Sequence, residues 1–335
     1  MILATDIGAT NARVAAFDLE GNRLNCVVET VYKAAEHKGL SEVLTDFISS
    51  NGVMVDRACI GAAGPVRQGT IRIVNLDWTI NSKEVAQQLR LPCVGLINDL
   101  EAFAYGITVL SNSDFVTLQE GNHPNPTGNT AVIAAGSGLG EAGMYWDGVR
   151  QHPFPCEGGH ADFAARNDIE IELLRYLKKR HEHVSVERIL SGPGIRNVYE
   201  FLRDTKTEEE PGWLADQMKA ATDVPALISQ LALEHKARIC ERTMEIFVSA
   251  YGAEAGNCAL KFMSTGGMYV GGNIAVKALP LLKQPQFMDA FLGKGRMRAL
   301  LEDMPVKVVL NDDAGILGAA HYTLVQKAFG TKVTQ

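Results

Sequence analysis

The chain has 335 residues, of which 46% are hydrophobic and 21% are charged, and its formal net charge is −7. One hydrophobic core rarely serves so many residues, so we expect two domains. The acidic balance argues against non-specific binding to nucleic acid or to an anionic membrane surface, and we expect neither as a partner.

Short apolar runs and helix-spaced apolar residues alternate over the first 110 residues. They predict strands at residues 2–6, 11–18, 24–31, 57–62 and 91–98, and helices at residues 40–48, 84–89 and 100–110. A similar opening follows, with strands predicted at residues 115–118, 130–135 and 142–146. A glycine-rich turn between two strands therefore occurs twice, and two such halves can grip one ligand between them.

The rest of the chain is predicted to be mainly helical. We expect one helix around residues 171–177, a long helix from about Pro225 to Tyr251, and an exposed acidic segment at residues 204–216. Two more strands are predicted at residues 268–270 and 306–310, and a final helix at residues 313–326.

Two of the turns have the chemistry of phosphate-binding loops. Residues 6–11 (Asp-Ile-Gly-Ala-Thr-Asn) offer backbone N–H groups and a hydroxyl to an anion, and a carboxylate to a hydrated Mg²⁺. Residues 136–140 (Gly-Ser-Gly-Leu-Gly) match neither a Rossmann fingerprint nor a Walker A loop. For both turns a plain hairpin is the alternative.

Other polar residues also stand at predicted strand ends. Gly271 and Gly272 let a flat ring or a phosphate approach a helix N-terminus, although Asn273 capping that helix is an equal alternative. Asn98 and Asp99 suit sugar hydroxyls, although Asp99 can instead cap the next helix.

Two carboxylates and an imidazole fall near glycines further along the chain, at Glu157, His160 and Glu187. They suggest polyol recognition or a metal site, but Cys156 and His160 lack the partner cysteines of a zinc site. The six cysteines form no Cys-x-x-Cys pair, which is typical of reduced thiols in a cytosolic protein. The N-terminus lacks the features of a signal peptide and no apolar stretch is long enough to span a bilayer, so we expect a cytoplasmic location.

Taken in order, these motifs resemble the bacterial glucokinase family, in the non-ROK branch of the actin-like, hexokinase and Hsp70 ATPase superfamily. The resemblance runs from Ile2 to about Tyr322 and includes residues 64–65 (Gly-Pro), 157–163 (Glu-Gly-Gly-His-Ala-Asp-Phe) and 187–194 (Glu-Arg-Ile-Leu-Ser-Gly-Pro-Gly). The cysteine cluster that binds zinc in the related ROK kinases is absent from the sequence.

The resemblance implies an α/β fold with two RNase H-like (actin-like ATPase) domains, each on a mixed five-stranded sheet, flanking a central cleft. The smaller domain would comprise residues 1–110 with 313–335, and the larger one residues 111–312. It also implies a cytoplasmic homodimer that transfers the γ-phosphoryl group of Mg-ATP to the 6-hydroxyl of glucose, a step of glycolysis.

Site residues are implied by the same resemblance, position by position. Asp99 would be the catalytic base. The sugar would be held by Asn98, Asp99, Glu157, His160, Glu187, Gly64, Pro65 and Asn75. ATP would contact Asp6, Gly8, Ala9, Thr10, Asn11, Gly136, Ser137, Gly138, Gly271 and Gly272. Asp6 would also reach Mg²⁺ through water.

The sequence departs from the family pattern at three positions. Ala9 stands where a second glycine is more usual, and its methyl group would hinder a backbone that needs positive φ. Ser137 replaces a threonine and keeps the hydroxyl. Glu141 stands where an apolar residue is more usual and would repel ATP phosphates unless it points away.

Three alternative functions stay open at this stage. A kinase for another hexose would keep the site and change its preference. A non-catalytic sugar sensor is disfavoured, because related repressors carry an N-terminal DNA-binding extension while the first strand here begins at Ile2. An actin-like or chaperone-like nucleotide switch would leave Asn98, Asp99, Glu157 and His160 without a purpose.

Overall fold

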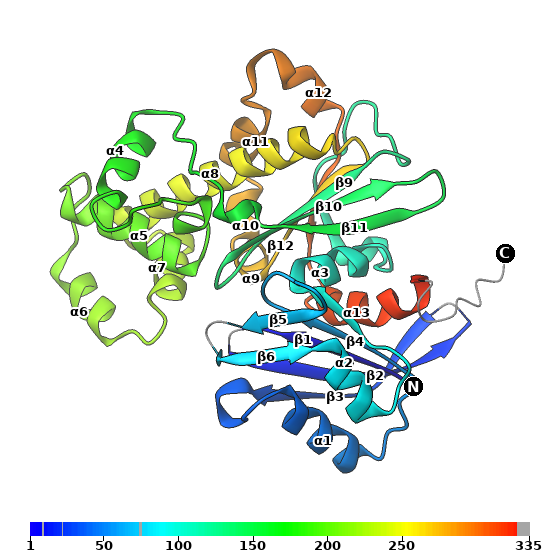
Figure 1. Cartoon of the computed structure of the whole chain (residues 1–335). Coiled ribbons are helices and arrows are strands. Elements are labelled where there is room, and N and C mark those ends of the chain that lie inside the picture. The colour runs from blue at the N-terminus through cyan, green and yellow to red at the C-terminus, as the bar shows by residue number, and fades with distance from the viewer. Residues whose placement is uncertain (9, 22, 74–75, 327–335) are drawn as a thin grey trace. The chain divides into compact units, whose positions relative to one another are not determined.

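The computed structural model describes residues 1–8, 10–21, 23–73 and 76–326. They form a mixed α/β structure that divides into two compact units (Figure 1). The first unit contains Met1–Asn112, His152–Pro155 and the segment from Asn311 onward. The second unit contains Ser113–Gln151 and Cys156–Leu310.

The first unit is built on a sheet that has five strands within the described residues, in the order β3-β2-β1-β4-β7. Their bounds are β1 Ile2–Ile7, β2 Asn11–Glu20, β3 Arg23–Lys33, β4 Arg57–Ala62 and β7 Gly95–Asn98. β1, β2 and β3 are antiparallel neighbours, whereas β4 and β7 run parallel to β1. The carboxyl ends of β1, β4 and β7 therefore share one edge of the sheet.

Helices cover both faces of this sheet. α1 (Leu40–Asn51) and α2 (Ser82–Leu89) pack on one face, where Phe47 of α1 joins the core around Leu3 and Ile60. α3 (Asp99–Ile107) and α13 (Ala314–Val325) pack on the other, where Ile316 joins the core around Ala4. Figure 1 shows α1 in blue and α13 in red on opposite sides of the strands.

Two features of the first unit differ from the prediction. A hairpin of β5 (Thr70–Ile73) and β6 (Trp78–Asn81) lies between β4 and α2, and its short strands escaped the sequence pattern. Its apolar side chains face inward, with Trp78 4% exposed. The strand predicted from Leu91 begins only at Gly95, because Pro92 has no backbone N–H to donate to a sheet.

The second sheet has six strands within the described residues, not the five that the resemblance implied. Five of them lie in the second unit, whereas His152–Pro155 of the sixth, β11, is grouped with the first unit. Their order is β11-β10-β9-β12-β13-β8. The bounds are β8 Phe115–Gln119, β9 Thr130–Ala135, β10 Leu139–Trp146, β11 Gln151–Cys156, β12 Gly267–Gly271 and β13 Val306–Val309. The turn at Asp147 reverses the chain after β10 and adds β11 as an edge strand.

The long helix α8 (Arg238–Phe262) packs against β9. The other helices of the second unit are α4 Asp168–Leu177, α5 Gly192–Asp204, α6 Gly212–Ala220, α7 Val224–Leu233, α9 Asn273–Lys277, α10 Leu279–Leu282, α11 Pro285–Leu292 and α12 Arg298–Glu302. Of these, α5, α7, α10, α11 and α12 pack against α8. Figure 1 shows α4 to α7 grouped in green near one end of α8. Among the helices of the described residues, none combines the length and apolar character that a membrane crossing requires.

The long helix predicted from Pro225 to Tyr251 is wrong, because the chain breaks between α7 and α8. His235 adopts a φ of 53°, and the N–H of Lys236 donates to the carbonyl of Leu231. Helix formers fill this segment, so local propensity does not predict the break. The predicted exposed acidic segment at residues 204–216 is mostly exposed and includes the start of α6.

Candidate active site

Three turns of the first unit meet at the edge where β1, β4 and β7 end. The register pairs Asp6 with Gly61 and Ala62 with Asn98. The N–H of Ala63 donates to the carbonyl of Ile7 at 2.9 Å. The parallel strands thus place the predicted phosphate turn, the Gly64–Pro65 turn and the Asn98–Asp99 pair beside one another.

Asn98, and not Asp99, is the N-cap of α3. Its Oδ1 accepts from the N–H groups of Leu100 at 2.8 Å and Glu101 at 3.2 Å, and its Nδ2 donates to the carbonyl of Gly64 at 3.2 Å. Asp99 is the first helical residue, half-buried, and its Oδ1 accepts from Leu100 N–H at 2.9 Å. The alternative in which Asp99 caps the helix is therefore wrong, since Asn98 does the capping and also fixes the Gly64 turn.

Asp6 is half-buried at the end of β1 and packs against the start of α13. A Cβ on Gly315 would lie 3.1 Å from its Oδ2, closer than an ordinary contact, so glycine at this position leaves room for the carboxylate. Burial raises the pKa of Asp6, and the neighbouring Arg13 guanidinium opposes that rise. A carboxylate oxygen is the donor that Mg²⁺ prefers, so this residue fits the ion that the resemblance implies.

The turn after Asp6 is a tight hairpin. The N–H of Gly8 donates to the carbonyl of Asn11 at 3.0 Å, and the carbonyl of Thr10 accepts from the N–H of Ala34 at 2.9 Å. The side chains of Thr10 and Asn11 are exposed and available to a ligand. Two predicted site residues, Ala9 and Asn75, lie outside the described residues.

The second glycine-rich turn joins β9 to β10 in the second unit. The N–H of Gly136 donates to the carbonyl of Gly138 at 2.9 Å, and the N–H of Gly192 donates to the carbonyl of Gly136 at 2.8 Å. Ser137 is exposed at the tip. The first residue of α5, Gly192, therefore holds the turn through a backbone hydrogen bond.

Gly272 follows β12 and lies beside the end of β9. Its φ is 84°, and a Cβ would stand 2.3 Å from the carbonyl oxygen of Ala135. Residue 272 must therefore be glycine for both steric reasons. Gly272 also occupies the N-cap position of α9, so the alternative in which Asn273 caps that helix is wrong.

Tyr251 of α8 ties these two strand ends together, and the sequence analysis missed it. Its hydroxyl donates to the carbonyl of Gly271 at 2.9 Å and accepts from the N–H of Ala135 at 3.1 Å. Its side chain is fully buried. The one available signal, a tyrosine in an apolar helical stretch, is also the pattern of an ordinary core residue.

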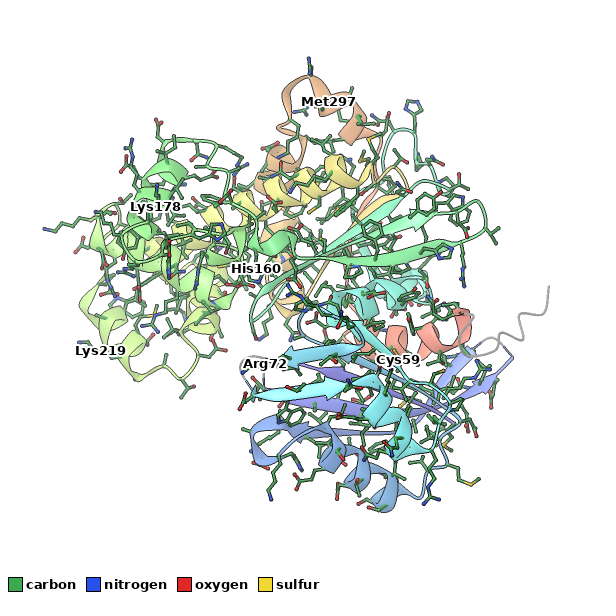
Figure 2. All side chains as sticks on the ribbon, viewed as in Figure 1. Cys59, Arg72, His160, Lys178, Lys219 and Met297 are labelled. Carbon is green, nitrogen blue, oxygen red and sulfur yellow. The ribbon has the colours of Figure 1, made fainter. Side chains whose placement is uncertain are left out.

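The predicted sugar residues of the second unit lie next to the second glycine-rich turn. Oε2 of Glu187 accepts a hydrogen bond from the N–H of Leu139 at 2.9 Å. Glu157 and His160 stand on the 3-10 turn η4 (Gly158–His160) and its start, with Nε2 of His160 4.0 Å from Oε2 of Glu157. Their side chains are 52% and 62% exposed, and Figure 2 labels His160 on this turn.

Glu141, which raised the question of phosphate repulsion, is buried inside the second unit. Its side chain contacts Glu254 and Cys258 of α8 rather than solvent, and it is 1% exposed. Burial raises its pKa to about 7. The carboxylate therefore points into the protein interior.

The chain is similar to glucokinases over nearly its whole length. The family model described as Glucokinase matches residues 3–326. The glucokinase of Trichormus variabilis (strain ATCC 29413 / PCC 7937) is 39% identical over 335 residues, covering 96% of this chain and 98% of that protein.

Solved glucokinase structures are also similar to the chain. The crystal structure of a glucokinase from an Antarctic psychrotroph matches with a TM-score of 0.81 and 31% identity, covering 96% of this chain and 98% of that one. A ROK family glucokinase from Streptomyces griseus, solved with glucose and AMPPNP, shares the fold with a TM-score of 0.64 at 20% identity, covering 96% of this chain and 98% of that one. Because the family model and a 39% identical relative each match nearly the whole chain, the protein belongs to the glucokinase family.

Proposed function

We propose that the chain transfers the γ-phosphoryl group of ATP, bound with Mg²⁺, to the 6-hydroxyl of glucose, giving glucose 6-phosphate and ADP. The full-length match to glucokinases supports the reaction. The observation that carries the site is Asp99, half-buried at the end of β7 and fixed there by the Asn98 cap. Kinases place a carboxylate in this way to receive the proton of the attacking hydroxyl.

Asp99 acts as the base during transfer and not before it. A carboxylate is a much weaker base than an alkoxide, so it cannot hold the hydroxyl proton in the ground state. It orients the 6-hydroxyl and accepts its proton as the new O–P bond forms. Most of the rate acceleration then comes from positioning and from stabilisation of charge.

Glu157, His160 and Glu187 hold the sugar hydroxyls. The exposed side chains of Glu157 and His160 can become satisfied when a sugar covers them. A sugar with one inverted hydroxyl leaves a covered polar group unpaired, which is how such a site rejects it. Asn98 contributes mainly by positioning, because both ends of its amide already bind the protein.

The nucleotide is held by both glycine-rich turns and by Gly271 and Gly272. Backbone N–H groups of the two turns and the hydroxyls of Thr10 and Ser137 receive phosphate oxygens. Asp6 would hold Mg²⁺ through its water shell, and the ion would supply positive charge to the phosphates.

We also propose the RNase H-like division into residues 1–110 with 313–335 and residues 111–312, the cytoplasmic location and the homodimer. The mixed parallel and antiparallel pairing in each sheet supports the division. The family resemblance supports the location and the homodimer.

The test is hexose 6-phosphate formation with Mg-ATP and a panel of hexoses, on wild type, Asp99→Asn and Asp18→Asn. Asp18 is exposed on β2 and serves as the matched control. Selective turnover of glucose that falls at least about 10³-fold in Asp99→Asn and stays unchanged in Asp18→Asn supports the proposal. Selective turnover of another hexose would keep the kinase activity and change the proposed substrate to that hexose. A folded protein that binds ATP but turns over no sugar would overturn the kinase proposal and favour a sugar sensor or a nucleotide switch.

A further inference from the structure

A buried group of possible metal ligands lies in the second unit, formed by Glu141 of β10 with Glu254 and Cys258 of α8. One carboxylate oxygen of each glutamate and the Sγ of Cys258 all lie within 4.8 Å of one another. Glu254 and Cys258 are four residues apart on the helix, so they share a face and both meet the strand. All three residues are buried.

Glu141 is the residue of this group whose hydrogen bonding is incomplete. Its Oε1 is inaccessible to solvent and has no hydrogen-bond partner within the described part of the chain. A buried polar atom left without a partner costs about 1–3 kcal/mol, so such an atom in a native protein calls for an explanation. An ion that binds there provides one.

The backbone around Glu141 leaves room for its carboxylate. A Cβ on Gly158 would stand 1.9 Å from Oε2, so any other residue at position 158 would displace this side chain. The thiol of Cys156 donates to the backbone carbonyl of Glu141 at 3.4 Å. The turn that carries Glu157 and His160 is thus packed directly over the Glu141 side chain.

Charged side chains of both signs surround the group. Glu254 already has partners, since Lys261 Nζ lies 3.3 Å away and Asn257 Nδ2 donates to it at 2.8 Å. Lys294 Nζ donates to the Oδ1 of Asn257 at 2.6 Å. With both lysines protonated, the two carboxylates and a thiolate at Cys258 give the group one net negative charge, which favours a bound cation.

We propose that Glu141, Glu254 and Cys258 bind one divalent transition-metal ion of the zinc class, separate from the ion that accompanies ATP. A thiolate donor favours zinc-class ions over Mg²⁺ and Ca²⁺. A tetrahedral ion holds such donor atoms about 3–4 Å apart, so small side-chain adjustments close the site. Three protein ligands leave a fourth position for water. The ion would tie β10 to α8.

The test uses Co²⁺ alone, added to protein stripped with a chelator in a Cys26→Ser background, which removes the exposed thiol. We expect one cobalt per chain and a near-ultraviolet thiolate-to-cobalt charge-transfer band. The band should disappear in Cys258→Ser, persist in Cys240→Ser, a matched buried cysteine of α8, and resist a thousandfold excess of Mg²⁺. A band equally strong in Cys258→Ser, no band in the parent protein, or displacement by Mg²⁺ overturns the proposal.

A second measurement keeps the proposal falsifiable if Cys258→Ser does not fold. Glu141→Gln keeps the shape of the side chain and removes one ligand charge. Zn²⁺ should raise the Tm of the parent protein and of Cys240→Ser by several degrees, because a ligand that binds only the folded state stabilises it. The same rise in Glu141→Gln, or no rise in the parent, overturns the site.

Discussion

Glu187 accepts a hydrogen bond from the backbone N–H of Leu139, at 2.9 Å. Leu139 belongs to the turn proposed to receive the phosphates, and Glu187 is proposed to hold the sugar. Under this proposal, one carboxylate of the second unit binds both the sugar and the turn that receives the phosphates. A sugar hydroxyl that binds Glu187 shares that carboxylate with the turn.

Replacing Glu187 with Gln should weaken the binding of both substrates, glucose and ATP. The amide keeps the shape of the side chain but forms weaker hydrogen bonds than a carboxylate, and a bond to a charged group is worth about 1.5–3 kcal/mol. We expect kcat/KM for glucose to fall about 10- to 100-fold, with a smaller loss of affinity for a non-hydrolysable ATP analogue measured by calorimetry. Glu182→Gln, an exposed neighbour, is the control. Unchanged affinity for the analogue would show that the turn does not depend on Glu187.

Replacing Gly272 with Ala should destabilise the second unit. The methyl group would meet the carbonyl of Ala135 and require a left-handed backbone, for a loss of about 2 kcal/mol or more in the free energy of unfolding. Urea unfolding measures this loss. Gly212→Ala is the matched control, because a Cβ there meets nothing within 4 Å, and it should stay within about 1 kcal/mol of wild type. Equal effects of the two substitutions would contradict the steric argument.

Replacing Arg13 with Ala should destabilise the first unit by about 1–3 kcal/mol. Its guanidinium binds Glu29 at 2.8 Å, Asp313 at 2.6 Å and the carbonyl of Asp312 at 3.0 Å. Arg13→Lys should recover only part of the loss, because a single ammonium group cannot reach all three acceptors in this geometry. Thermal melts with Arg23→Ala, an exposed arginine of β3, as the reference check this. Full rescue by Lys would show that charge alone matters.

Stability should depend on the ionisation of Glu101. Burial raises its pKa to about 7 from the ordinary value of 4.5. Between these values the folded state binds the proton and the unfolded state does not, so the free energy of unfolding falls as pH rises from about 4.5 to 7.

Glu101→Gln should therefore match wild type near pH 4.5 and exceed it at pH 8 by on the order of 1–3 kcal/mol. Urea unfolding at the two pH values measures the difference. Glu84→Gln, exposed on α2, should show no such change with pH. If the free energies of unfolding of wild type and Glu101→Gln differ by the same amount at both pH values, burial of the Glu101 charge does not cause the difference.

Local sequence pattern predicted the elements whose residues alternate or repeat clearly. The strand predicted at residues 57–62 has the same bounds in β4, and the strand at residues 130–135 the same bounds in β9. Local sequence pattern predicted less where a residue's hydrogen-bond partners are distant in the sequence. The break at His235 occurs among good helix formers, and the amide nitrogen of Asn98 is held by the carbonyl of Gly64, which lies 34 positions away in the sequence.

The candidate site was predictable in part for the same reason. Motif order indicated which turns carry polar groups, since those turns are continuous in sequence. The support for them is not continuous, because Tyr251 reaches Ala135 across 116 positions and Arg13 reaches Asp313 across 300. No local window contains both members of such a pair.

The first unit takes its last helix from the far end of the chain, where Asp313 meets Arg13. On a ribosome, the strands of this unit emerge long before α13 does. The face of the sheet that α13 covers, which includes Ala4 and Phe17, must stay without that cover while the whole second unit is synthesised. Completion of the first unit is therefore one of the latest events of translation, and a nascent chain stalled before residue 313 would present that apolar face to chaperones.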